Sequence, residues 1–126
     1  MRFERIRSYL KTNIILCGIL LLLPNMALAG NRPAYTIVIK NHQFDPAELT
    51  VPAGKKIKLV IDNQDPTPEE FESYDLNREK IVTGNGTISV FIGPLKPGEY
   101  KYFGEFHQDT AQGIIKAVDN INQEEK

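Results

Sequence analysis

The sequence predicts an all-β protein, built as a single Greek-key β-sandwich or barrel. Apolar and polar residues alternate through most of the chain from Tyr35 onward, and no stretch sustains a helical period. Segments rich in glycine, proline and asparagine separate these runs at a spacing of roughly 8–12 residues, which is typical of β-sandwiches. About seven short strands follow from this pattern.

Each expected strand is an alternating or β-branched run, and turns connect the runs. We expect strands at residues 35–40, 49–51, 56–62, 74–82, 87–92, 99–103 and 114–118. Residues 41–46 are expected to form a turn with Phe44 as its buried anchor. Residues 63–73 are expected to form a loop because of their prolines, with one helical turn at 68–70 capped by Thr67.

Residues 1–29 have the pattern of a secretory signal peptide. Basic residues precede the apolar run 14–23, and Ala27-Leu28-Ala29 supplies the small residues that an export peptidase requires. The run is short for a membrane span, and a retained anchor is the alternative interpretation. We therefore expect export to the periplasm, removal of residues 1–29, and one domain over residues 30–126 that ends in a polar, frayed tail.

Composition excludes several kinds of site from the mature chain. The only cysteine, Cys17, lies in the signal peptide, so neither a disulfide nor a thiolate ligand is expected. Cleavage removes four of the 15 basic and one of the 16 acidic residues, which leaves 11 and 15 and a net charge of −4. This mildly acidic balance argues against nucleic-acid binding.

Acidic residues cluster in two expected loops, one of which holds a histidine. Glu69, Glu70, Glu72 and Asp75 lie in the first loop, and Glu105 and Asp109 lie beside His107 in the second. Carboxylates with one imidazole suit Fe, Mn, Zn or Cu(II), whereas a blue copper site needs a thiolate. The alternative is that these acids are simply solvated.

Alternate residues of an extended chain share a side. Glu70 and Glu72 are therefore expected on one side of their segment, and Glu105 and His107 on one side of theirs. The phenylalanine between each pair is expected to point into the core. The two pairs could then converge on one metal at one end of the sheet.

The remaining candidates are weaker. His42 flanks a turn, has no acidic neighbour before Asp45, and is expected at the surface. Neither Ser73 nor Ser89 has a histidine base nearby in sequence, as a serine nucleophile would need. No glycine-rich phosphate loop is present.

Several segments, in their order and spacing, resemble a cupredoxin. They are Phe44-Asp-Pro, Leu49-Thr-Val-Pro-Ala-Gly54, Leu59-Val-Ile-Asp-Asn63, Gly98-Glu-Tyr-Lys-Tyr102 and the loop from His107 to Gly113. The resemblance covers nearly all of residues 35–118. It implies a Greek-key sandwich of seven or eight strands with copper held at one end.

The chain departs from the cupredoxin pattern at the ligand positions. Gly104 stands where the cysteine would be, His107 matches the loop histidine, and Thr110-Ala111 replaces the methionine. The upstream histidine position falls in residues 69–72. Nitrosocyanin, a more distant relative, also has a glutamate there but keeps its cysteine. The departures argue against a blue copper electron carrier.

A closer resemblance is to small exported cupredoxin-like proteins that accompany bacterial ferrous-iron permeases. It is carried by Glu70-Phe-Glu-Ser73, Arg78-Glu-Lys80 and Phe103-Gly-Glu-Phe-His107. It implies a protein that binds Fe(II) for a membrane permease, with copper assisting. Whether the protein also oxidises the Fe(II) is left open by the resemblance. The implied ligands are Glu70, Glu72, Glu105 and His107, then Glu79, with Glu69 and Asp109 as further candidates.

The resemblance leaves the partner and the activity open. The partner would be the iron permease or another periplasmic metal-binding protein, with only peripheral contact to the membrane. The cofactor would be a copper ion, an iron ion or both. Two alternatives are a copper carrier without redox turnover and a metal-free β-sandwich that docks a partner.

Overall fold

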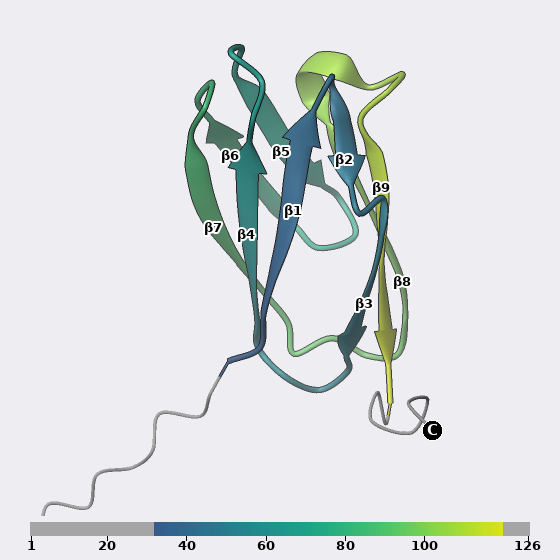
Figure 1. Cartoon of the computed structure of the whole chain (residues 1–126). Helices are drawn as coiled ribbons and strands as arrows, with labels where there is room; N and C mark the ends of the chain where they lie inside the picture. The colour runs from purple at the N-terminus through teal and green to yellow at the C-terminus, as the bar shows by residue number, and fades with distance from the viewer. Residues whose placement is uncertain (1–31, 120–126) are drawn as a thin grey trace, which may run out of the picture.

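The computed structural model describes residues 32–119, which form two β-sheets packed face to face (Figure 1). Its elements are β1 (Ala34–Lys40), β2 (Gln43–Asp45), β3 (Glu48–Pro52), β4 (Ile57–Asn63), β5 (Glu69–Ser73), β6 (Arg78–Val82), β7 (Thr87–Ile92), β8 (Gly98–Gly104), the 3-10 turn η1 (Glu105–His107) and β9 (Gln112–Val118). The predicted all-β sandwich is confirmed, with nine strands instead of about seven. The expected signal peptide and the tail from residue 120 lie outside the described residues.

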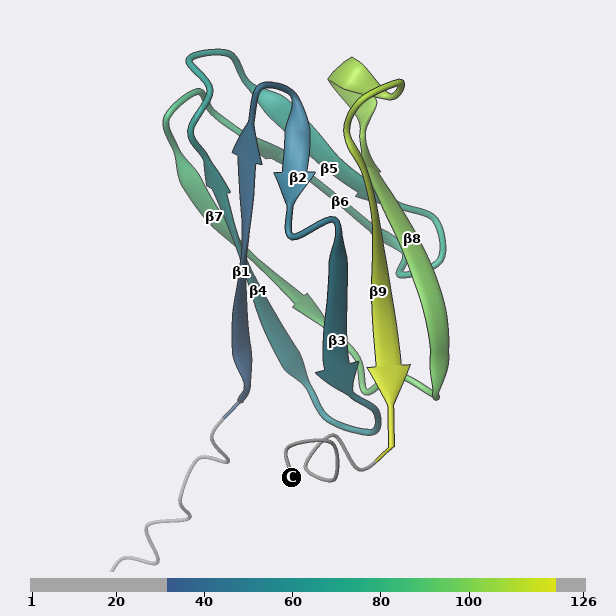
Figure 2. The ribbon, with the colours of Figure 1, turned by 45° about the vertical axis from the view of Figure 1, so that its right-hand side comes forward.

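Both sheets mix parallel and antiparallel pairs. The first has the order β2-β1-β4-β7 and the second β3-β9-β8-β5-β6; the pairs β1–β4 and β3–β9 are parallel. The described chain begins and ends at one end of the sandwich, while the β1–β2 turn and η1 lie at the other (Figures 1 and 2). Among the described residues, no helix is long and apolar enough to cross a bilayer.

The core lies between the sheets and is filled by alternate residues of the strands. Every second residue of β4 is buried, as its alternating sequence predicts. Phe44, the expected anchor, is buried against Phe71 and Tyr102, with ring centroids 6.4 and 5.0 Å away. Removing such a buried ring costs about 3–5 kcal/mol, so this cluster is a main support of the fold.

The helical turn expected at residues 68–70 is wrong, because β5 begins at Glu69. In β5, Glu69, Phe71 and Ser73 are buried and the residues between them are half-buried. The strand pairs with β6 on one side and with β8 on the other. One isolated helical turn fixes several dihedral angles for a single hydrogen bond, and two strand partners outweigh it.

Two expected segments differ from the structure in extent. Residues 41–46 contain the short strand β2, because Asn41 and His42 alone make the turn back from β1. The strand expected at 74–82 starts only at Arg78, since a turn precedes it: the amide of Asn77 donates to the carbonyl of Tyr74 at 3.2 Å.

The segment after β8 also differs from expectation. Residues 105–107 form a 3-10 turn, so Glu105 and His107 do not share a side as they would in an extended chain. Because the chain coils in this 3-10 turn, the side chain of Phe106 points outward and is 47% exposed. The prediction that Phe106 lies in the core is therefore wrong.

Two long cationic side chains of β6 connect the sheets along their neighbouring edges. Arg78 Nε donates to the carbonyl of Phe91 at 2.7 Å, and Lys80 Nζ donates to the carbonyl of Ser89 at 3.0 Å. Their charges lie along an edge that would otherwise offer unpaired strand groups to another chain.

Candidate metal centre

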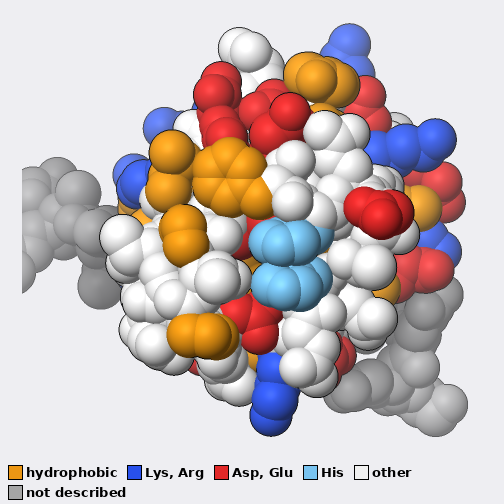
Figure 3. Space-filling view, turned by 90° about the horizontal axis from the view of Figure 1, so that it is seen from above, with side chains coloured by type: hydrophobic (Ala, Val, Ile, Leu, Met, Phe, Trp, Pro, Cys, Tyr) orange, Lys and Arg blue, Asp and Glu red, His pale blue; other side chains and the backbone are white. Residues whose placement is uncertain are grey.

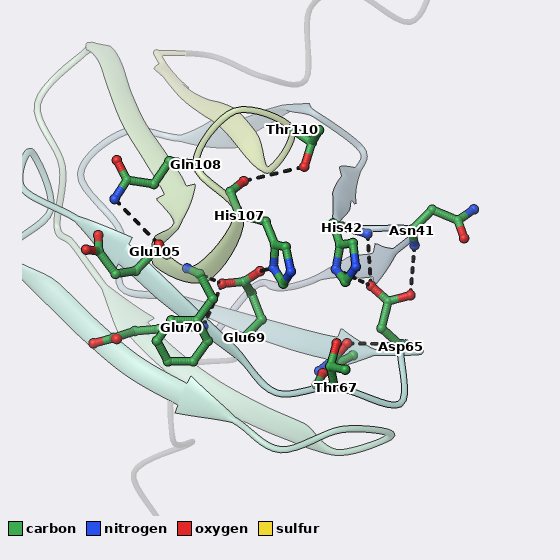
Figure 4. Close-up of polar contacts among 12 residues, drawn as sticks. Asn41, His42, Asp65, Thr67, Glu69, Glu70, Glu105, His107, Gln108 and Thr110 are labelled. Atoms are coloured by element: carbon green, nitrogen blue, oxygen red, sulfur yellow. Dashed lines mark hydrogen bonds and ion pairs between the residues drawn. The ribbon is translucent and has the colours of Figure 1, made fainter.

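Three side chains that can bind a metal meet at the end of the sandwich opposite the termini of the described chain. His42 belongs to the β1–β2 turn, Glu69 is the first residue of β5, and His107 is the last residue of η1. One ligand atom from each lies within 4.8 Å of the others. Figure 4 shows the two imidazoles side by side, with Glu69 next to His107 and Asp65 next to His42.

The loop that carries His107 is closed by main-chain hydrogen bonds. The carbonyl of His107 accepts from the amide of Ala111 at 2.8 Å and from that of Thr110 at 3.2 Å. The amide of Gly104 donates to the carbonyl of Ala111 at 2.9 Å across the base of the loop. The imidazole is 29% exposed, so a fixed loop presents it to solution.

Glu69 is a buried carboxylate with several hydrogen-bond partners. It is only 1% exposed, and its Oε1 accepts from the amides of Glu70 and Phe106, both at 2.9 Å. Its Oε2 lies 2.6 Å from Nδ1 of His107. A buried carboxylate is costly unless it is hydrogen-bonded, and these contacts compensate it.

The absence of a side chain at Gly104 makes room for Glu69. A Cβ atom placed there would lie 2.7 Å from Cδ of Glu69 and 2.7 Å from Cβ of Ala111. Carbon atoms normally approach to about 3.5–4.0 Å. The Glu69 carboxylate therefore occupies the space that a larger residue at position 104 would need.

His42 is held by an unusual turn. Asn41 and His42 have φ angles of 52° and 56°, in the left-handed region that L-residues other than glycine seldom adopt. Positive φ at both central residues is the geometry of a two-residue type I′ hairpin turn. The turn connects β1 to β2 and leaves the His42 side chain 41% exposed beside His107.

Asp65, which lies in the loop that follows β4, stabilises this turn with two hydrogen bonds. Its Oδ1 accepts from the amide of Asn41 at 2.8 Å and its Oδ2 from the amide of His42 at 2.9 Å. Burial would raise the pKa of Asp65, but these two hydrogen bonds and the nearby imidazoles of His42 and His107 outweigh it and lower that pKa below its ordinary value.

The two imidazole rings stack on each other. Their centroids are 3.5 Å apart and their planes differ by 12°. Nδ1 of His107 faces Glu69, and Nδ1 of His42 lies 3.4 Å from Oδ2 of Asp65. Seen from above, the pair lies at the surface with acidic side chains nearby (Figure 3).

Comparison with models of known protein families identifies the family of this chain. The model of the cupredoxin-like domain matches residues 13–117. The chain belongs to this family. An uncharacterized protein of Rickettsia prowazekii is 57% identical over 79 residues, which are 63% of this chain and 63% of that protein. This chain therefore aligns with less than two thirds of that relative's length.

Solved structures of cupredoxins share the fold. Auracyanin A, a blue copper protein of Chloroflexus aurantiacus, has a TM-score of 0.59 at 18% identity, over 68% of this chain and 98% of that one. The metal-binding domain of a Cu(I)-exporting P-type ATPase of Streptococcus pneumoniae, with Cu(I), has a TM-score of 0.59 at 12% identity, over 68% and 85%. At these identities the likeness establishes the fold alone.

The residues of this cupredoxin-like chain fit a copper ion held by nitrogen and oxygen, and they do not fit a blue copper centre. Two imidazoles with neighbouring carboxylates are donors that suit Cu(II). A blue site requires a thiolate, and the described residues include no cysteine. Gly104, which matches the cysteine position by resemblance, faces a space that Glu69 already fills.

The acids implied by the resemblance fall into a separate group. Glu70, Glu72 and Glu79 offer carboxylate oxygens within 4.8 Å of one another. Glu70 and Glu72 share one face of β5, as predicted, while Glu69 points to the opposite, buried face. The pKa of Glu70 is raised because its protonated form donates a hydrogen bond to Glu79, and desolvation and the surrounding negative charges add to the rise. Desolvation and the charges of Glu79 and Glu105 raise the pKa of Glu72.

The structure thus divides the expected ligands between two places. His107 pairs with Glu69, one of the further candidates, and Glu70 lies with the acids of β5 and β6. Glu105 is exposed on η1 and Asp109 is exposed in the turn after it, and neither belongs to either group of three.

Sequence reasoning missed His42 and Asp65. The two are 23 residues apart, and the parallel pairing of β1 with β4 brings them together. One local pattern could have indicated the turn: a β-branched run ending in Asn41-His42, followed by a second alternating segment, is a candidate for a two-residue hairpin.

Proposed function

We propose that this protein is an exported metal-binding protein of the periplasm that holds a copper ion between His42 and His107 and serves in iron uptake. One observation carries the copper site: two solvent-accessible imidazoles stack at 3.5 Å, each with a carboxylate at its Nδ1. Copper bound there would supply a redox-active centre. The two rings, whose planes now differ by only 12°, would have to turn out of the stack for both to direct a nitrogen lone pair at one ion.

The link to iron uptake is supported by residues outside the copper site. The sequence of β5, Glu-Glu-Phe-Glu-Ser, resembles that of proteins accompanying ferrous-iron permeases. Its outer acids, Glu70 and Glu72, offer carboxylate oxygens within 4.8 Å of one of Glu79. They would offer hard oxygen donors to Fe(II) on its way to a permease.

The copper site is tested by titrating the metal-free mature protein with Cu(II). Binding at micromolar or lower concentration is expected for the wild type and loss of it for His42→Ala and His107→Ala. Glu70→Gln and Glu79→Gln serve as matched controls and should bind copper as the wild type does. No binding by the wild type would rule out the proposal in favour of a metal-free docking module.

The iron role is tested by aerobic Fe(II) oxidation with the copper-loaded and the copper-free protein. Faster oxidation with copper, reduced by Glu70→Gln, supports the role in iron uptake. An unchanged rate in the presence of bound copper supports a copper carrier without turnover. Cell fractionation with N-terminal sequencing of the mature protein tests the export that residues 1–29 predict.

A further inference from the structure

The end of the sandwich at which the described chain begins (Figure 1) carries a group of cations. The amide of Lys58 donates to the carbonyl of Pro33 at 2.9 Å, and the amide of Gly54 donates to the carbonyl of Leu95 at 2.8 Å. Because β1 and β4 run parallel from this end, the segments before β1, β4 and β8 meet there. Their cations form what we call the basic end: Arg32, Lys55, Lys56, Lys58 and Lys96.

A hollow at this end is lined by cations and an exposed aromatic ring. Arg32, Lys56 and Arg78 line it, beside Phe91, and its volume is about 210 Å³. The guanidinium carbon of Arg32 lies 5.6 Å from the centre of the Phe91 ring, which is 48% exposed. Pockets that enclose small-molecule ligands measure roughly 300–1,000 Å³, so this hollow fits a single anionic group such as a phosphate.

Few of the described carboxylates oppose the charge of the basic end. Within residues 32–119, no ion pair joins one of its cations to an acid. Asp119 follows β9 at this end, and Glu99 lies opposite Lys116 in the β8–β9 ladder. Acidic side chains gather instead around the histidine pair at the other end, which we call the histidine end (Figure 3). The charge is therefore polarised along the strands.

The two ends are far enough apart to act separately. A strand of seven residues such as β1 is about 23 Å long. The Debye length at physiological ionic strength is only about 8 Å. An anionic surface that touches the basic end is therefore screened from the acids of the histidine end, although the net charge of the mature chain is −4.

We propose that the basic end docks on an anionic phospholipid bilayer, with lipid phosphates at its cations and in the hollow beside Phe91. Basic residues combined with an exposed aromatic side chain suit the interface of an anionic bilayer. The sequence favours a bilayer as the partner, because the apolar run 14–23 shortly precedes Arg32. The histidine end then faces away from the lipid, whether or not it holds a metal.

Vesicle sedimentation of the mature protein tests this docking. Binding is expected to vesicles that contain phosphatidylglycerol and not to phosphatidylcholine alone, and added NaCl should weaken it. Lys55→Gln/Lys96→Gln should reduce affinity about 10- to 30-fold, since each cation near an anionic surface contributes about fivefold. Lys40→Gln/Lys101→Gln is the matched control, because it changes the net charge equally and its side chains are also exposed. It should bind as the wild type does.

A single tryptophan reports which end touches the lipid, because the chain has none. With anionic vesicles, the emission of Phe91→Trp should shift to shorter wavelength. The emission of Phe106→Trp, at the histidine end, should not, although Phe106 is 47% exposed and thus as accessible as Phe91.

Three results would overturn the proposal: no binding to anionic vesicles, equal weakening by the two double variants, or a shift of Phe106→Trp without one of Phe91→Trp. Binding of inorganic phosphate by a protein that ignores the vesicles would also overturn it, in favour of a soluble anion in the hollow.

Discussion

At the scale of single residues, Gly104 determines which donor reaches the centre. A side chain at this position would compete with the carboxylate of Glu69 for the same space. The protein therefore keeps a buried carboxylate beside His107, and oxygen and nitrogen are the donors available there. Gly104 thus accounts for the absence of a thiolate from the candidate centre of this cupredoxin-like sandwich.

Gly104→Ala should destabilise the protein by about 1–3 kcal/mol, the usual cost of overpacking a core. The new Cβ would lie 2.7 Å from both Glu69 Cδ and Ala111 Cβ, so both contacts must be relieved by a shift of the surrounding atoms. Urea unfolding measures the loss. The double variant Gly104→Ala/Ala111→Gly should lose less than the sum of the single variants; additive losses would contradict the contact.

Asp65 makes the stability of the folded protein depend on pH in the acid range. Its folded-state pKa lies below the ordinary value of 3.8, so the unfolded chain takes up the proton first. The stabilisation is present above that value and is lost as the pH falls through the folded-state pKa. Urea unfolding from about pH 5 to pH 2 should show a steeper loss for the wild type than for Asp65→Asn. Parallel curves would contradict this role.

At the scale of elements, the β1–β2 turn has a strained backbone and carries the candidate ligand His42. His42 adopts a left-handed conformation that costs roughly 1 kcal/mol for any residue but glycine. Strain of this kind persists only where the surrounding structure enforces it. Here the carboxylate of Asp65 binds both amides of the turn.

His42→Gly should therefore be more stable than His42→Ala by about 1 kcal/mol, although both lose the imidazole. Urea unfolding of the two metal-free variants measures the difference. Both should lose copper binding equally, which separates the role of the ring from that of the turn. A glycine variant no more stable than the alanine variant would show that the turn is not strained.

The pairing of β5 with β6 places like charges together. Glu72 lies directly opposite Glu79 in the ladder, an arrangement that destabilises a sheet. Because the pKa values of Glu70 and Glu72 are raised, the contribution of these two groups to stability is greatest at low pH and is lost as the pH rises through their folded-state pKa values.

Glu79→Gln should raise the melting temperature at pH 7, and the gain should shrink as the pH falls toward 4.5, the ordinary pKa of Glu70. Thermal unfolding followed by circular dichroism measures it. Glu99→Gln is the control without a gain, because Glu99 lies near the cation of Lys116. An equal gain in both variants would point to net charge instead of this pairing.

At the scale of the whole molecule, the alternating pattern predicted the sandwich well, because each strand buries one face and the period of two is visible in the sequence. The core position of Phe71 followed from the same rule and is confirmed. Phe106 did not follow it, since a 3-10 turn at the end of β8 replaces the expected extended chain.

The centre was predictable only in part. His107 was found because Glu105 and Asp109 stand beside it in the sequence, and the acids of residues 69–72 were found because they cluster in one short segment. The partnership of His42, Asp65 and His107 depends on three chain segments that only the folded sheets bring together. A left-handed histidine, moreover, is not visible in a sequence.

The central claim is that His42 and His107 hold the metal together, and electron paramagnetic resonance of the Cu(II)-loaded protein tests it most directly. The account predicts hyperfine coupling to two imidazole nitrogens in the wild type and to one in His42→Ala or His107→Ala. A spectrum with a single nitrogen in the wild type, or one that His42→Ala leaves unchanged, would contradict it.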